Sequence, residues 1–329
     1  MTIKSIFKIS AGISFIFLSL LMVTGWGLGG GYIPSDSEAF SSILYLRNMG
    51  GVGQMIRSLH FYLSSSLIIS GFIFLISFYI LGYVSRFTKQ WYFSLIIYFL
   101  IVGSCFTGYL LPMDQNAFWG TLVRLGIVET IPFFGTFIAN ILRGGLTIGS
   151  ETLSRFFTIH SSIIPIFLSV ISLVLIQSQW ENIKLIVSRA SILYGTILGV
   201  ILLYYWAFSF SAPLELPANP IDVEYIPRPE WYFLWLFEFG KYVEWAPWIR
   251  SALLPLLGTL FLFGLPFIKQ QSSKQRYTIA ITWCSVWLIL TGITLYADRN
   301  LPDKLDYEAA MFVEAKENYQ SLCYDCHGS

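Results

Sequence analysis

The sequence predicts an all-α integral membrane protein with about seven transmembrane helices, in which a bundle of four is followed by three more. Hydrophobic residues make up 55% of the 329 residues and charged residues only 12%, and the mean hydropathy is +0.66. Soluble chains carry roughly 25% charged residues. The apolar residues also gather into seven stretches of bilayer length, about 20 residues each. A net charge of +1 excludes a nucleic-acid-binding protein, which needs a basic surface.

The first stretch resembles a signal peptide, because Lys4 and Lys8 precede its apolar run. However, residues 25–32 offer no clean small-residue cleavage site and six more stretches follow, so we expect it to be retained. In chain order, the seven stretches cover residues 9–26, 59–83, 91–111, 156–176, 192–210, 253–268 and 279–296.

The charged residues predict the topology. The N-terminus and the loops after the second, fourth and sixth stretches carry nine basic residues against one acid, Glu181. The positive-inside rule places these segments in the cytoplasm. Seven spans from a cytoplasmic N-terminus then put the C-terminus outside. The nine basic residues are Lys4, Lys8, Arg86, Lys89, Lys184, Arg189, Lys269, Lys274 and Arg276.

Three long loops lie on the predicted outer face, at residues 28–58, 112–155 and 211–250. They are rich in Gly, Pro and Trp. Loops of this length on one face of a membrane protein usually build a site or a docking surface.

Two histidines lie at similar depth near the outer face. His60 begins the second stretch and His160 the fourth, and these stretches run in the same direction. Two imidazoles from facing helices are the usual axial pair of a b-type haem in a helix bundle. Arg57 and Arg155 precede them and would meet the haem propionates at the interface. The alternative is two interfacial histidines bonded to loop backbone; the matched depth and the upstream arginines favour the haem.

Four segments together resemble the cytochrome b family of bc and b6f complexes. The Pro-Glu-Trp-Tyr and Gly-Tyr-Leu-Leu-Pro runs within them are the most specific. The resemblance covers nearly residues 1–296 and implies a quinol-oxidising membrane subunit that works with a Rieske iron–sulfur protein. The segments are GGVGQMIRSLH (50–60), GYLLPMDQNAFWG (108–120), TLSRFFTIH (152–160) and RPEWYFLWLFEF (228–239).

The same resemblance divides the chain into three expected regions. Residues 1–180 resemble a four-helix cytochrome b6, and residues 181–300 resemble a three-helix subunit IV that carries the outer quinol-site loop. Residues 301–329 form an outer tail. The expected location is the bacterial cytoplasmic (inner) membrane, as a multi-pass protein.

One feature departs from the family, which normally has a second histidine fourteen residues after each of the first two. Fourteen residues return to nearly the same helical face, so two haems stack across the membrane in such proteins. Here those positions are Phe74 and Val174. We therefore expect at most one b-type haem, in the outer, low-potential position, and no full Q cycle.

Glu230 is the expected catalytic residue of an outer quinol pocket. Its carboxylate, at the edge of the bilayer, is suited to accept a proton from a quinol hydroxyl. The resemblance implies that Tyr232 and Tyr109 position the quinone ring or its oxygens. An interfacial aromatic belt is the plain alternative, and the intact Pro-Glu-Trp-Tyr order argues against it.

The C-terminal tail contains Cys323, Cys326 and His327 in the spacing of a c-type haem attachment motif. Two thiols would bind the haem covalently and His327 would be an axial ligand. The sequence stops two residues later, so a clipped chain, a haem held partly by a partner, or a chance match remain open. Cys105 and Cys284 lie within apolar stretches and are expected to be packing residues.

The sequence thus predicts an electron-transfer subunit, part of an oxidoreductase from quinol to cytochrome c or another acceptor. The expected partners are a Rieske protein, c-type cytochromes, membrane quinol and a second copy of the chain within a larger complex. The rival interpretation is a haem-poor scaffold that anchors redox partners. A transporter has little support, because apart from the histidines no ionisable side chain lies deep in a span.

Overall fold

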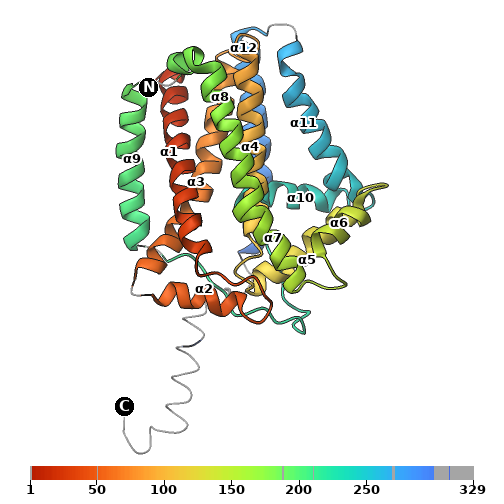
Figure 1. Ribbon diagram of the computed structural model, residues 1–329. Coiled ribbons are helices and arrows are strands. Elements are labelled where there is room, and N and C mark those ends of the chain that lie inside the picture. The colour runs from red at the N-terminus through yellow and green to blue at the C-terminus, as the bar shows by residue number, and fades with distance from the viewer. Residues whose placement is uncertain are drawn as a thin grey trace, which may run out of the picture.

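A computed structural model describes residues 2–49, 51–186, 189–209, 211–268, 271–299 and 311. Within these ranges all named elements are helices, joined by loops, and an isolated β-bridge links Asp114 and Pro217. The prediction of an all-α fold is confirmed. Figure 1 shows long, nearly parallel helices with a layer of shorter helices at one end.

In the described part of the chain, six helices are long and apolar enough to cross a membrane. The remaining predicted stretch, residues 192–210 and fifth in chain order, falls on α9 (Arg189–Ser209), a helix of 21 residues that packs along α1. At about 1.5 Å per residue it also has bilayer length. The six are α1 (Ile3–Gly29), α3 (Val52–Ile80), α4 (Thr88–Gly108), the continuous helix Ser150–Ser178, Ile249–Phe267 and α12 (Ser273–Asp298).

Two of these continuous helices contain a π-helical turn. Ser150–Ser178 is built from α7 (Ser150–Thr158), the π-helix Ile159–Ile163 and the first part of α8 (Ile164–Ile186). Ile249–Phe267 is a π-helix, α11 (Leu254–Gly264) and a 3₁₀ turn. Such π turns occur often at functional sites, and the first of them contains His160.

Local sequence explains where the spans begin. The Thr2 hydroxyl accepts the backbone N–H of Ser5 at the start of α1, and Ser272 and Gln275 form a reciprocal capping box at the start of α12. The helix α3 starts after Gly51, whose φ of +81° suits glycine. It therefore begins seven residues before the predicted stretch, and His60 lies about two turns inside it.

In the bundle, α1 packs between α3 and α9, while α4 packs against α8 and α3. On the other side, α12 packs against α3 and α10 (Leu234–Tyr242). The N-terminus, where α1 begins, lies at the upper end of the bundle in Figure 1.

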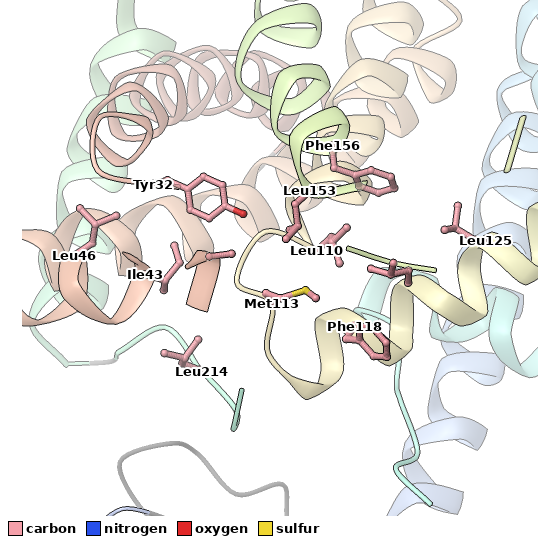
Figure 2. Packing of buried hydrophobic residues seen from close by; sticks show 12 residues of the cluster. Tyr32, Ile43, Leu46, Leu110, Met113, Phe118, Leu125, Leu153, Phe156 and Leu214 are labelled. Carbon is pink, nitrogen blue, oxygen red and sulfur yellow. The ribbon is translucent and has the colours of Figure 1, made fainter. Parts of the chain in front are cut away.

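The opposite end of the bundle is covered by residues 30–49, 109–149 and 211–230, which together form a loop layer. Its helices are α2 (Ala39–Asn48), α5 (Gln115–Glu129) and α6 (Gly135–Arg143). Figure 2 shows how its apolar side chains pack onto the ends of the bundle helices: Leu110, Met113 and Phe118 meet Leu153 and Phe156 of α7, with Tyr32, Ile43, Leu46 and Leu214 beside them. This packing holds the three long loops as one compact layer.

Candidate functional site

The structure brings the two predicted haem ligands together. His60 of α3 and His160 of the π-helical turn have ring centroids 6.0 Å apart, and the ring planes are inclined at 79°. With a metal–imidazole bond of about 2 Å on each side of one ion, two axial imidazoles have centroids roughly 6 Å apart. The spacing therefore suits a single metal centre held between both rings.

Hydrogen bonds on Nδ1 orient both rings. The Thr24 hydroxyl donates to the carbonyl of Leu20, at 2.9 Å, so its oxygen is left to accept from Nδ1 of His60, at 3.0 Å. Nδ1 of His160 donates to the carbonyl of Ser104, at 2.9 Å. A proton on Nδ1 leaves Nε2 unprotonated as the ligand atom, which is the arrangement typical of metal-binding histidines.

Two glycines make room for the rings. A Cβ atom on Gly25 of α1 would lie 3.0 Å from Cε1 of His60, and one on Gly108 of α4 would lie 2.6 Å from Cε1 of His160. Small residues of this kind let helices approach a flat group closely. With two neutral imidazoles, fixed tautomers and glycine walls, the residues present fit a bis-histidine haem. Within the described ranges, no group of three or more His, Cys, Asp or Glu residues gathers as a metal site of another type.

The two predicted propionate partners have contacts of their own. Arg57 is buried, 8% exposed, and donates from its two terminal nitrogens to the carbonyls of Ala212 and Pro213, each at 2.7 Å. It ties the segment after α9 to α3. Arg155 is exposed and donates to the carbonyl of Ile141. A role for either in binding propionates stays a prediction.

An aromatic cluster surrounds Phe74, one of the two positions at which a second histidine was expected from the family resemblance. Phe74 is stacked on Phe7 of α1, with ring centroids 5.0 Å apart and planes inclined at 14°. Phe78 meets Phe7 edge to face at 5.5 Å and also contacts Trp91 of α4. Val174 lies on the exposed side of α8. Aromatic rings thus pack together in the half of the bundle that lies away from the loop layer, which is called the N-terminal half because it contains the start of α1.

The three predicted quinol-site residues also lie close together. Glu230 ends an extended segment, and Trp231–Phe233 forms a 3₁₀ turn directly after it. The hydroxyl of Tyr109, at the end of α4, donates to the carbonyl of Arg228 at 3.1 Å. The Arg228 guanidinium in turn binds both oxygens of Asp298 at 2.7 and 2.8 Å. The end of α4, the Glu230 segment and the end of α12 are therefore tied to one another.

Tyr232 faces the bundle side of this site. It lies near Cys105, which is one turn before Gly108 on α4 and packs against the same apolar cluster. Burial raises the pKa of the Tyr232 hydroxyl, so it stays protonated and available as a hydrogen-bond donor. The charge of Glu230 acts on both Tyr109 and Tyr232, which places the carboxylate near the two tyrosines.

One residue of the site was not predicted from the sequence. The Cζ atom of Arg124, on α5, lies 3.5 Å from the ring centroid of Tyr109 and 5.5 Å from that of Phe106. Burial lowers the pKa of Arg124, while the negative charge of Glu230 acts to raise it. The available signal was the single charge inside the apolar run TLVRLGI, residues 121–127, directly after the Gly108–Gly120 motif.

The c-type haem motif cannot be placed in this fold. Cys323, Cys326 and His327 lie outside the described residues. Cys105 and Cys284, by contrast, are described as free cysteines. Cys105 packs against a buried apolar cluster that includes Leu63 and Ile101, as its predicted packing role requires.

Comparison with known proteins adds to this geometry. The family described as cytochrome b/b6/petB matches residues 1–179. A cytochrome bc complex cytochrome b subunit of Chlorobaculum thiosulfatiphilum is 27% identical over 316 residues, 88% of this chain and 73% of that protein. Cytochrome b6 of Euglena gracilis is 32% identical over 163 residues, 49% of this chain and 76% of that protein. A chain of a solved hyperthermophilic respiratory Complex III shares the fold with a TM-score of 0.76 and 19% identity, over 96% of this chain and 88% of that one.

Proposed function

Because this chain belongs to the cytochrome b family, we propose that it is the membrane electron-transfer subunit of a bc-type complex that oxidises quinol beside the loop layer. Its electrons pass to a single b-type haem and to a Rieske or c-type acceptor. One observation carries the proposal: the histidine pair, with rings 6.0 Å apart, lies at the same end of the bundle as Glu230, Tyr109 and Tyr232.

In this proposal, Nε2 of His60 and Nε2 of His160 would hold the haem iron. The haem supplies a one-electron acceptor within the membrane. The chain's contribution is to fix both imidazoles by the hydrogen bonds of Thr24 and Ser104. Arg57 and Arg155 lie toward the loop layer, where propionates would meet them, and Cys323, Cys326 and His327 would hold a covalent c-type haem.

Proton transfer in the quinol pocket is assigned to the chain's own residues. The Glu230 carboxylate accepts a proton from a quinol hydroxyl and passes it to water beyond the loop layer. The Tyr232 hydroxyl, kept protonated by burial, donates to the other ring oxygen. The Tyr109 hydroxyl already donates to the Arg228 carbonyl, so Tyr109 contributes its ring face and its oxygen as an acceptor.

The N-terminal half of the bundle argues against a full Q cycle. Phe7, Phe74 and Phe78 pack where a second haem would be needed, so an electron has no second centre by which to cross the membrane. A relative is named as a bc complex subunit, and a Rieske protein, c-type cytochromes and a second copy of the chain are the proposed partners. The proposed orientation in the bacterial inner membrane has the N-terminus in the cytoplasm.

The rival function is a haem-poor scaffold for redox partners. It is favoured by the aromatic cluster around Phe74 and by Arg57, whose guanidinium is already bound to two backbone carbonyls. The oriented histidine pair favours the redox function instead.

A pyridine haemochrome assay with iron quantitation on detergent-purified protein decides between the two. The expected result is one b-type haem per chain, which is lost in His60→Ala and in His160→Ala. His327→Ala is the matched control, because it removes a histidine that is not a proposed ligand of the b-type haem and should leave that haem in place. Two b-type haems would overturn the single-haem proposal. No b-type haem after expression with full haem supply would establish the scaffold.

A further inference from the structure

The side chain of Arg124 is partly buried, and one end of its guanidinium has no polar partner among the described residues. The Nη1 atom at that end has almost no accessible surface and no hydrogen-bond acceptor. In the described part of the chain, no carboxylate, carbonyl or hydroxyl forms a hydrogen bond or an ion pair with this side chain. Its contacts are the ring faces of Tyr109, at 3.5 Å, and Phe106, at 5.5 Å.

Such an arrangement is costly unless an acceptor completes it. A buried charge is normally paired or fully hydrogen-bonded. Arginine does not avoid this free-energy cost of burial by losing its proton, because the guanidinium stays charged in proteins. Ring faces offset only part of the lost hydration. A planar guanidinium with an unused N–H donor is suited to an oxygen that carries negative charge.

We propose that Arg124 is a substrate-binding residue of the quinol pocket, where its Nη1 donates to a ring oxygen of the quinol. This inference rests on the proposed function. As the quinol O–H bond breaks, the proton moves to the carboxylate of Glu230 and the electron pair stays on the ring oxygen. Arg124 stabilises that oxygen as it becomes anionic, and Tyr109 positions the guanidinium through its ring face.

The groups around Glu230 agree with this division of roles. The described groups whose charge interacts with Glu230 include Cys105 and Tyr109 from the α4 side, Arg124 from α5, and Tyr232 from its own segment. Among these described groups the cation is Arg124. It places a positive charge beside the proposed base, a combination suited to removing a proton and retaining the anion left behind.

A pair of matched probes tests the inference. At neutral pH 2-hydroxy-1,4-naphthoquinone is an anion, whereas 1,4-naphthoquinone has the same ring system without the charge. Equilibrium dialysis of both against the full-length protein in detergent gives the ratio of the two affinities. The variants are Arg124→Gln, which removes the charge, and Arg124→Lys, which keeps it. Arg143→Gln is the control, since Arg143 pairs with Glu129 in the loop layer.

The wild-type protein and the Arg143→Gln control should bind the anionic probe roughly 10- to 100-fold more tightly than the neutral one. Arg124→Gln should abolish this preference, and Arg124→Lys should retain most of it. A role in packing alone would change the affinity for both probes together and leave their ratio intact. An unchanged ratio in Arg124→Gln overturns the inference and leaves the proposed function standing. If the wild-type protein binds neither probe, the proposed quinol pocket itself is contradicted.

Discussion

The two halves of the bundle are built from the same helices and differ in side-chain size. Toward the loop layer, α1 and α4 present Gly25 and Gly108, which lie against the two imidazoles. Toward the N-terminal end, the same helices present Phe7 and Trp91, which pack with Phe78 of α3. Small residues leave room for a flat cofactor between helices, and large aromatic residues fill that room with protein.

The difference between the two halves shows that the number and length of the helices do not by themselves create a haem site. Four apolar helices of the right length suffice to span the membrane. Whether the interior holds a cofactor depends on candidate histidine ligands, on the glycines beside them and on the groups that orient the rings. Among the described residues, this combination occurs in the half of the bundle that contains His60 and His160.

The largest expected effect comes from filling the space beside His160. A Cβ on Gly108 would lie 2.6 Å from the ring, so Gly108→Val should push the imidazole from its position and reduce b-type haem content about tenfold or more. The pyridine haemochrome assay measures the change. Gly103→Ala on the same helix is the control, because its Cβ would meet Ile164 at an ordinary 3.8 Å. Full haem content in Gly108→Val would show that the pocket is not set by this contact.

The next effect concerns the aromatic half. Phe7 is 2% exposed and packs against Phe74, Phe78 and Tyr83, so Phe7→Ala should lower the free energy of unfolding by about 3–5 kcal/mol. Denaturant unfolding in detergent micelles measures it. Phe15 of the same helix is 60% exposed, and Phe15→Ala should change stability little. Equal effects of the two variants would contradict a packed N-terminal half.

A smaller effect is expected from the orienting hydrogen bond on His60. Thr24→Val keeps the shape of the side chain and removes the oxygen that accepts from Nδ1, so haem affinity should fall only by about tenfold. Haem titration of protein prepared without haem measures this. Ser19→Ala is the control, because the Ser19 hydroxyl bonds only to the carbonyl of Phe15 on its own helix. An unchanged affinity would mean that packing alone holds the ring.

The smallest effect is a pH dependence in the loop layer. Burial raises the pKa of Asp114 above 3.8, although the N–H groups of Ala117 and Glu215 donate to its carboxylate at 2.9 and 3.1 Å. A carboxyl with a higher pKa in the folded state binds more protons when folded, so the folded state loses stability as pH rises above 3.8 through the folded pKa. Asp114→Asn removes this titration.

The test for Asp114 compares thermal unfolding of wild type and Asp114→Asn across pH 4 to 7. The stability of the wild type relative to the variant should decrease as pH rises, by roughly 1.4 kcal/mol for each unit of pKa shift. A difference that increases with pH would mean that the two N–H donors outweigh burial and lower the pKa instead.

Much of the fold follows from the sequence, because each membrane-spanning segment must satisfy its own backbone hydrogen bonds. An apolar stretch of bilayer length does this by forming one helix. Six of the predicted spans therefore appear as apolar helices, and the remaining one appears as α9. The depth of His60 and His160 follows in the same way, since position along a helix is set by residue number. The identities of Phe74 and Val174 also predict, without any structure, that a second histidine pair is absent from these two positions.

The contacts that complete the site were decided by tertiary structure. Thr24 reaches His60 from 36 residues away, and Tyr109 reaches the Arg228 carbonyl across 119 residues. Such pairs depend on how helices rotate and pack, which no local pattern specifies. Arg57 illustrates the difference. Its place near His60 could be predicted, whereas its bonds to the Ala212 and Pro213 carbonyls exist only because the segment after α9 folds back over α3.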